Sequence, residues 1–213
     1  MIYDFPDPQA HIRQGDILQR IPRVDLDPAR LLVMSDSPQP KTEVLDWLKI
    51  AARMERTPAL VSVRPVYAIV ITQDCDAGRV EDIALCEVDR FDVVYPAGKD
   101  AKYPKRTMDL ITKQSRINLK WFYLPREPRI GFTVPMAADF QSVLHVSRAY
   151  LEQNVAAMRL ARLNDLADEH FRERLAEYFR RYPYDEWYPL DKAELEEYRR
   201  SKPEPIQPYP WQV

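Results

Sequence analysis

Runs of apolar and β-branched residues in the first two thirds of the chain predict short β-strands. The densest run, residues 61–72, ends in the turn-forming sequence QDCDAG, and residues 83–95 provide its antiparallel partner. Further strand patterns lie at residues 12–24, 115–125, 130–135 and 140–146. Five or six short, mostly antiparallel strands with abrupt turns indicate a small β-barrel rather than a parallel sheet.

Apolar residues at helical spacing then predict helices. An insertion helix is expected at about residues 42–55, with Thr42 as its N-cap, and further helices are expected over residues 147–200. Residues 201–213 are Pro-rich and favour an extended conformation. We therefore predict one α+β domain over residues 1–213, in which residues 12–146 form the barrel with its helical insertion.

Composition narrows the classes of function. The net charge of −2 and the pI of about 6.0 give no overall basic field, so a nucleic-acid partner would have to meet a local basic patch. Four scattered glycines exclude a Gly-rich phosphate loop, and two cysteines exclude a disulfide framework. We see no signal-peptide pattern and no apolar run of about 18 residues, so we expect a cytoplasmic protein without a membrane segment or a cofactor.

The segment QDCD, residues 73–76, brings the most chemistry together, and three interpretations stay open. In the first, Asp74 and Asp76 simply bind backbone amides in the turn that follows a buried strand. In the second, both carboxylates bind a metal ion together with His145. In the third, Cys75 is a nucleophile, which would need His11, His145 or His170 as its base.

Basic residues offer a second set of candidates. Arg64 stands before a proline in the strongest predicted strand, where it is either a surface ion-pair partner or a phosphate ligand. A basic stretch interleaved with aromatic residues follows, and it is either a solvated loop or a surface for single-stranded RNA. Its candidate substrate-binding residues are Lys113, Arg116, Lys120 and Trp121, to which we add Arg13 and Gln73 from the earlier segments.

Several of these segments resemble a known family. RQGDILQRIPRV at residues 13–24, VRPVYAIVITQDCD at 63–76 and FQSVLHVSRAYLEQNVAAMRLARL at 140–163 are similar to the opening and the late segments of MazF/PemK-type toxins. The chain is also similar to uncharacterised bacterial proteins that carry QGD and QDCD segments. The resemblance covers about half of the chain, in pieces, and it implies an SH3-like barrel with a C-terminal helix, commonly as a homodimer.

The resemblance also implies an activity, because many members of that family are sequence-specific endoribonucleases. Arg64 matches the catalytic arginine, which would stabilise charge on the RNA phosphate while the 2′-hydroxyl attacks. The family's second catalytic position is a Ser or Thr, whereas Cys86 and Glu87 are the nearest residues here. Asp74 or Asp76 is the candidate base.

Three functional readings follow. The favoured one is a toxin-like module of a bacterial defence or stress-response system that binds RNA or an antitoxin-like protein, with candidate endoribonuclease activity. The first alternative is a catalytically silent module that binds a regulatory protein. The second alternative is a metal-dependent enzyme centred on the QDCD turn, and fold analogy alone does not choose among the three.

Overall fold

The computed structural model describes residues 2–34, 41–52, 56–95, 120–180 and 196. The chain divides into two compact units, Met1–Phe179 and Arg180–Val213, and the second contains only two of the described residues, Arg180 and Glu196. No helix among the described residues is long and apolar enough to cross a membrane. Apart from Glu196, the part of the predicted C-terminal helices from residue 181 to residue 200 and the Pro-rich tail, 201–213, lie outside the described residues.

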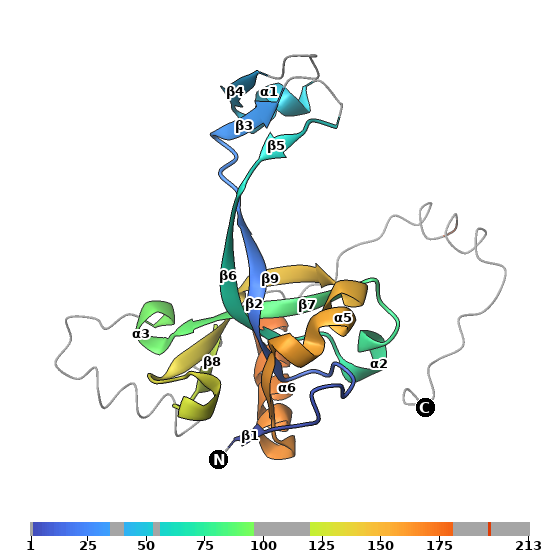
Figure 1. Cartoon of the computed structure of the whole chain (residues 1–213), viewed down its shortest axis with the longest axis vertical. Coiled ribbons are helices and arrows are strands. Elements are labelled where there is room, and N and C mark those ends of the chain that lie inside the picture. The colour runs from blue at the N-terminus through green and yellow to red at the C-terminus, as the bar shows by residue number, and fades with distance from the viewer. Residues whose placement is uncertain (1, 35–40, 53–55, 96–119, 181–195, 197–213) are drawn as a thin grey trace. The chain divides into compact units, whose positions relative to one another are not determined.

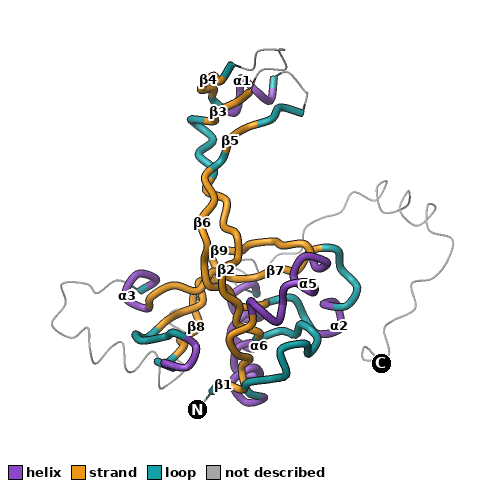
Figure 2. Tube along the Cα trace, viewed as in Figure 1, coloured by secondary structure: helices purple, strands orange, loops and turns teal. Residues whose placement is uncertain are grey.

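A curled, mostly antiparallel seven-stranded sheet forms the centre of the first unit (Figures 1 and 2). Its strand order is β1-β10-β2-β6-β7-β9-β8. The bounds are Tyr3–Asp4 (β1), Asp16–Asp25 (β2), Ser62–Val70 (β6), Asp82–Arg90 (β7), Trp121–Leu124 (β8), Met136–Ser147 (β9) and Arg159–Leu163 (β10). This sheet with its helices confirms the mixed α+β class and is consistent with a small barrel.

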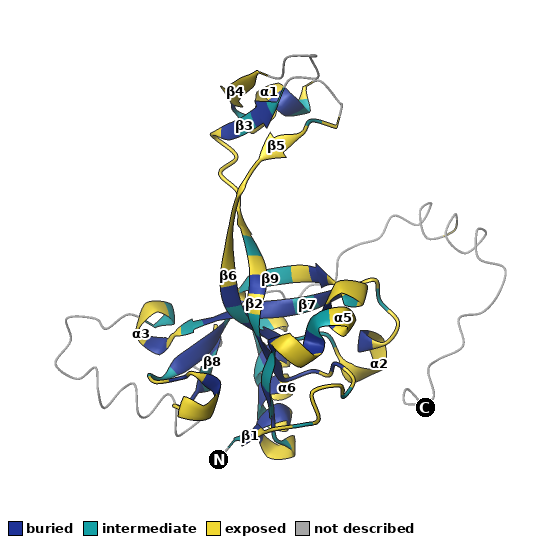
Figure 3. Cartoon of the chain, in the orientation of Figure 1, coloured by how far each residue is buried: buried dark blue, intermediate teal, exposed yellow. Residues whose placement is uncertain are grey.

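The inner part of this sheet is buried on both faces, whereas residues 22–25 of β2 and 62–65 of β6 are largely exposed (Figure 3). Ile69 and Phe140 belong to one core cluster, in which the helix α6 (Asp165–Phe179) contributes Phe171. The neighbouring Ala68 and Val70 belong to a second cluster, which the helix α5 (Arg148–Met158) completes. The two helices therefore cover opposite faces, and the inner strands read as nearly continuous apolar runs for this reason.

A strand interrupts the predicted C-terminal helices. Residues 159–163 form β10, which pairs with both β1 and β2, so the segment that separates α5 from α6 belongs to the sheet. Ala161 and Leu163 point into the first core cluster, while Arg162 pairs with Asp16 of β2. Burial of alternate side chains and this ion pair favour a strand over a continuation of α5.

The insertion between β2 and β6 is a small α+β module rather than a helix alone. Its three-stranded sheet has the order β4-β3-β5, with β3 at Leu31–Met34, β4 at Thr42–Leu45 and β5 at Ala59–Leu60. Thr42 lies in β4 and not at an N-cap. The helix α1 (Trp47–Ala51) instead begins after Asp46, whose side chain accepts a hydrogen bond from the Leu48 amide.

Three shorter segments also differ from the expected pattern. QDCD forms one helical turn, α2 (Asp74–Ala77), and the expected strand at 83–95 ends at Arg90, where the helix α3 (Phe91–Val94) begins. The expected strand at 130–135 does not form: Ile130 ends a 3₁₀ turn, η1 (Pro128–Ile130), Gly131 takes the left-handed φ of 81°, and Phe132 makes only an isolated bridge to Glu127. Residues 115–119 of the predicted strand before β8 lie outside the described residues.

Candidate functional sites

The QGD turn at the start of β2 is held by a buried ion-pair network. Asp16 is fully buried and accepts hydrogen bonds from Arg162 at 2.6 and 3.0 Å, while Arg159 lies 3.1 Å away. Arg159 also donates to the carbonyl oxygens of residues 7, 8, 10 and 11. Burial lowers the pKa of Arg159, although the charge of Asp16 acts in the opposite direction. The network fastens the N-terminal segment to β2 and β10.

The same turn brings QGD and QDCD into direct contact. Arg13 donates to Oδ2 of Asp74 from Nε at 3.0 Å and from Nη2 at 2.8 Å, and the Gln14 amide donates to Oδ1 at 2.8 Å. The Gln14 side chain donates to the Ile71 carbonyl oxygen at 2.9 Å. Burial acts to raise the pKa of Asp74, but the hydrogen bonds from Arg13 and Gln14 outweigh it, so this pKa lies below its ordinary value. Asp74 therefore stays ionised as the clamp between the two segments.

Beside this clamp lies a cavity of about 630 Å³. Ile71, Leu175, Ala176 and Phe179 give it apolar walls, and its polar lining residues are Gln14, Gln73, Asp74, Cys75 and Arg172. Arg172 donates to Asp168, one turn earlier on α6. An apolar pocket with a few convergent polar groups is the usual form of a small-molecule site. The cavity thus unites Gln73 and Asp74 from one segment with Gln14 from the other.

Cys75 and Asp76 differ from Asp74 in their surroundings. The Cys75 thiol is exposed, and its one described hydrogen bond runs to Gln73 at 3.8 Å. The side chain of Asp76 is also exposed, and the hydrogen bonds described for this residue involve its backbone only. Among the described residues, no group of three or more His, Cys, Asp or Glu side chains is arranged to hold a metal ion. His145 lies on β9 opposite Ala84 and forms no such group with the QDCD turn.

Arg64 belongs to a separate charged cluster, which we call the Arg64–Glu87 cluster: Arg23, Asp25, Arg64 and Glu87. Arg64 Nη2 donates to Glu87 Oε1 at 2.8 Å, and Arg23 Nη1 lies 3.1 Å from Glu87 Oε2. The Glu87 side chain is 10% exposed, whereas half of the Arg64 side chain faces solvent. The hydrogen bond to Glu87 raises the pKa of Arg64. Two guanidinium groups thus converge on one largely buried carboxylate.

The three predicted catalytic residues are not brought together. Arg64 lies six residues before Val70 at the end of β6, which corresponds to about 20 Å at the rise of a strand. Asp74 and Asp76 lie beyond that end, in α2. Each group has its own partners: Asp74 meets Arg13, and Arg64 meets Glu87. The described residues therefore form two separate candidate sites.

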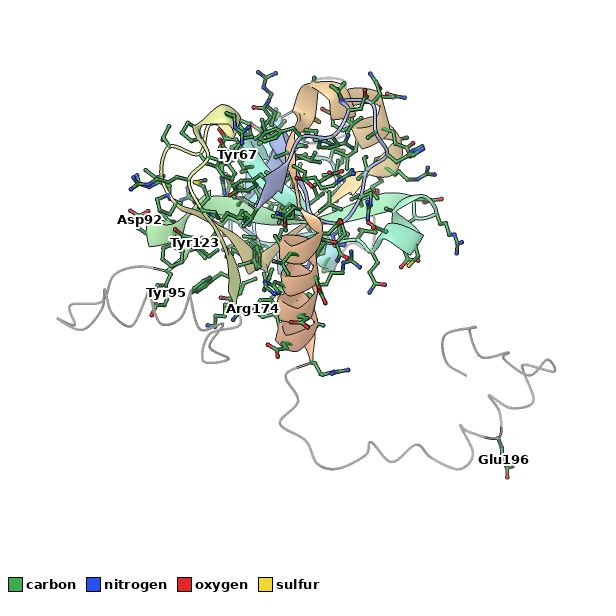
Figure 4. All side chains as sticks on the ribbon, turned by 90° about the horizontal axis from the view of Figure 1, so that it is seen from below. Tyr67, Asp92, Tyr95, Tyr123, Arg174 and Glu196 are labelled. Carbon is green, nitrogen blue, oxygen red and sulfur yellow. The ribbon has the colours of Figure 1, made fainter. Side chains whose placement is uncertain are left out.

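The predicted RNA-binding residues divide in a similar way. Lys113 and Arg116 lie outside the described residues, and Lys120 is exposed just before β8. Trp121 is 4% exposed and packs edge-on against Phe91 with ring centroids 5.0 Å apart. Tyr95 and Tyr123, labelled in Figure 4, border the same aromatic cluster. The Trp121 ring is therefore part of the hydrophobic core and presents no face on which an RNA base could stack.

Sequence reasoning assigned no role to Gln14, Arg172 or Glu87, although it named Glu87 as one of the residues nearest the missing hydroxyl. Gln14 and Arg172 carried no local signal, because only the tertiary fold places them beside QDCD. Glu87 did carry a local signal, since it is the only charged side chain within the apolar run from Ile83 to Val88.

Comparison of the sequence with models of known families gave no match, and no curated protein matched it.

Proposed function

We propose that this chain is a toxin-like module with an SH3-like barrel that binds single-stranded RNA at the Arg64–Glu87 cluster and cleaves it there. The observation that carries the proposal is the convergence of Arg23 and Arg64 on Glu87. Arginine is suited to phosphate because its planar group donates several hydrogen bonds to one oxyanion. A carboxylate between two such groups lies where a proton acceptor is needed beside a bound phosphate.

The chemistry would use each residue of the cluster in a defined role. The RNA 2′-hydroxyl donates its proton to Glu87, and the 2′-oxygen forms a bond to the adjacent phosphorus. The bond from phosphorus to the 5′-oxygen breaks, and that oxygen takes a proton from water at the exposed side of the cluster. Arg23 and Arg64 stabilise the charge that develops on the non-bridging oxygens.

Glu87 supports this role better than Asp74 or Asp76 does. Unlike them it contacts Arg64, as Asp25 also does, and each of its oxygens keeps accepting capacity after binding one guanidinium. It also takes the place of the Ser or Thr that the toxin resemblance leads one to expect. The proposed site therefore has a carboxylate from the neighbouring strand where the toxin family has a hydroxyl.

The test is a cleavage assay of the full chain on a mixed single-stranded RNA. We expect the parent protein to cleave, and Arg64→Ala and Glu87→Gln each to reduce the rate by about 100-fold or more, in line with the loss of a charge-stabilising or acid–base group. Arg90→Ala is the matched control, because Arg90 is an exposed arginine paired with Asp92. Equal activity in the parent and all three variants would refute the assignment of the cluster.

A second candidate function rests on the exposed apolar side chains of the insertion. Trp47 and Leu48 are 52% and 76% exposed, which favours the reading of a module that binds an antitoxin-like or defence-system protein in the cytoplasm. If the parent shows no cleavage over a range of pH and divalent metals, this reading becomes the better one. Binding of RNA without cleavage, lost in Arg64→Ala, would keep the cluster as a phosphate-binding site.

A further inference from the structure

The cavity beside the QDCD turn is lined by α6, by the segment that follows β6 and by the QGD turn. Its lining residues on α6 are three or four positions apart, which places them on one face of the helix: Arg172, Leu175, Ala176 and Phe179. Ile71 and residues 73–75 belong to the segment after β6, and Gln14 completes the lining. The volume of about 630 Å³ falls in the range of about 300–1,000 Å³ that is typical of small-molecule sites.

The charges at this cavity are balanced within the protein. Two of the lining residues are charged, Asp74 and Arg172. Asp74 pairs with Arg13 at 2.8 Å, and Arg172 pairs with Asp168 one turn earlier on α6. A charged ligand would have to break one of these pairs or enter a site with apolar walls without a counter-charge, and either event costs free energy. We therefore expect an uncharged ligand.

Gln14, the most buried polar residue of the lining, leaves one hydrogen-bond acceptor unused. The residue is 5% exposed, and its Nε2 donates to the Ile71 carbonyl oxygen at 2.9 Å. This bond fixes the orientation of the amide, because exchanging its nitrogen and oxygen would place two acceptors together. Among the described residues nothing donates to Oε1, and this oxygen is not sealed in the core, so it is open to the cavity that Gln14 lines. A ligand at this end of the cavity must therefore present an N–H or O–H donor.

The more exposed part of the lining offers donors and an aromatic ring. Arg172 donates to Asp168 from Nε and Nη2, and its Nη1 has no hydrogen-bond partner within the described part of the chain. The amide oxygen of Gln73 accepts from the Cys75 thiol, and its Nε2 likewise has no described partner. Phe179 is 60% exposed and adds an aromatic side chain to the lining. A ligand here meets two donors and a ring against which a planar group can stack.

We propose that the cavity binds a purine base, either in a free nucleoside or as an unpaired base of RNA. A purine base is planar and uncharged, and it carries N–H donors and nitrogen or carbonyl acceptors along its edges. Its N–H group donates to Oε1 of Gln14, and its acceptors meet Arg172 and Gln73. A two-ring base fills more of the cavity than a pyrimidine and buries more apolar surface against Ile71 and Leu175. This site is separate from the Arg64–Glu87 cluster and does not depend on cleavage there.

The first test is calorimetric titration of the full chain with adenosine, guanosine and purine riboside. We expect at least one of the first two to bind at one site per chain. Purine riboside has the same two rings but no N–H donor on its base, so it should bind about 10-fold or more weakly, because Oε1 of Gln14 stays unpaired. Ala176→Trp should abolish binding, since Ala176 is exposed and a larger side chain there fills the cavity without disturbing the core. Ala156→Trp is the matched control, because Ala156 is exposed on α5, and it should bind like the parent.

A second test locates the ligand and distinguishes its two sources. Cys75 is exposed and lines the cavity, so a nucleoside at about ten times its Kd should slow the labelling of Cys75 by a thiol reagent about 10-fold, because only the unbound fraction reacts.

The source is tested with a short single-stranded RNA of the base that binds, in an Arg64→Ala background that removes the other proposed RNA contact. If this RNA binds more tightly than the nucleoside and Ala176→Trp abolishes the gain, the ligand is a base of RNA; if it binds no more tightly, the ligand is the free nucleoside. The proposal is overturned if no purine probe binds at up to about 1 mM, or if Ala176→Trp leaves binding intact. Neither result requires RNA cleavage, so the fate of the Arg64–Glu87 assignment is decided separately.

Discussion

Gly15 offers the sharpest test of how the QGD turn is built. Its φ of 79° lies in the left-handed region, which costs a residue with a Cβ about 1–2 kcal/mol. A Cβ at this position would also lie 2.8 Å from Oδ1 of Asp168 and 3.3 Å from Cβ of Leu163. Asp168 is 5% exposed and bound to Arg172, so it cannot move aside without loosening that pair. Backbone strain and crowding together predict that Gly15→Ala lowers the free energy of unfolding by about 2–4 kcal/mol.

Urea and thermal denaturation would measure this loss, and we expect the melting temperature to fall by about 5–15 °C for a unit of this size. Gly78→Ala is the matched control, because Gly78 has a φ of −88° and nothing lies within 4 Å of its added Cβ. It should be neutral or stabilising by up to about 1 kcal/mol.

A double-mutant cycle separates the two causes. An Asp168→Ala background removes the 2.8 Å contact and leaves only the looser one with Leu163, so Gly15→Ala should there cost little more than the backbone term of about 1–2 kcal/mol. A change below about 0.5 kcal/mol in the parent background would refute the close approach of α6 to the turn.

Three further results are expected from the same packing. Asp16→Asn should lower the free energy of unfolding by about 3–5 kcal/mol, because it leaves buried guanidinium groups without their counter-charge, whereas the exposed Asp92→Asn should change it by less than about 0.5 kcal/mol. In the native protein at pH 8 a thiol reagent should modify Cys75 alone, because Cys75 is exposed and burial raises the pKa of Cys86 to about 12. Mass mapping that found both thiols labelled would contradict this. The pKa of Asp74 in the folded protein lies below its ordinary value of 3.8, so the ion pair with Arg13 stabilises the fold at pH values above 3.8 and this stabilisation is lost as the pH falls through the folded-state pKa. Between about pH 5 and pH 2 the free energy of unfolding should therefore change less steeply with pH in Asp74→Asn than in the parent.

The central strands could be predicted from the sequence because their signal is local. The run before QDCD and the run from Ile83 are dense in apolar residues whichever face they bury. The strand β10 could not be predicted in this way, because Ala161 and Leu163 are its only fully buried apolar residues and they directly follow a helical pattern. Its pairing with β2 depends on Asp16, which lies more than 140 residues away in the chain.

The candidate sites show the same division between local and long-range information. Asp74 and Asp76 look equivalent in sequence, yet only Asp74 receives Arg13 and the Gln14 amide, because the QGD turn lies against one side of α2. Pairing of the two strands places Glu87 opposite Ala68, on the same face of β6 as Arg64, whose long side chain covers the remaining four residues to reach it. That register cannot be read from composition or periodicity.

The cross-strand pair of Arg23 and Arg64 is unusual for a sheet, because like charges directly opposite each other destabilise the pairing. Glu87 and Asp25 offset this repulsion, which makes the cluster neutral. A bound phosphate must therefore compete with Glu87 for the same guanidinium groups. Half of the Arg64 side chain already faces solvent, so Arg64 can turn toward a phosphate while Arg23 keeps Glu87 in place. Such an exchange would bring the freed oxygen of Glu87 beside the bound phosphate, where the proposed proton transfer requires it.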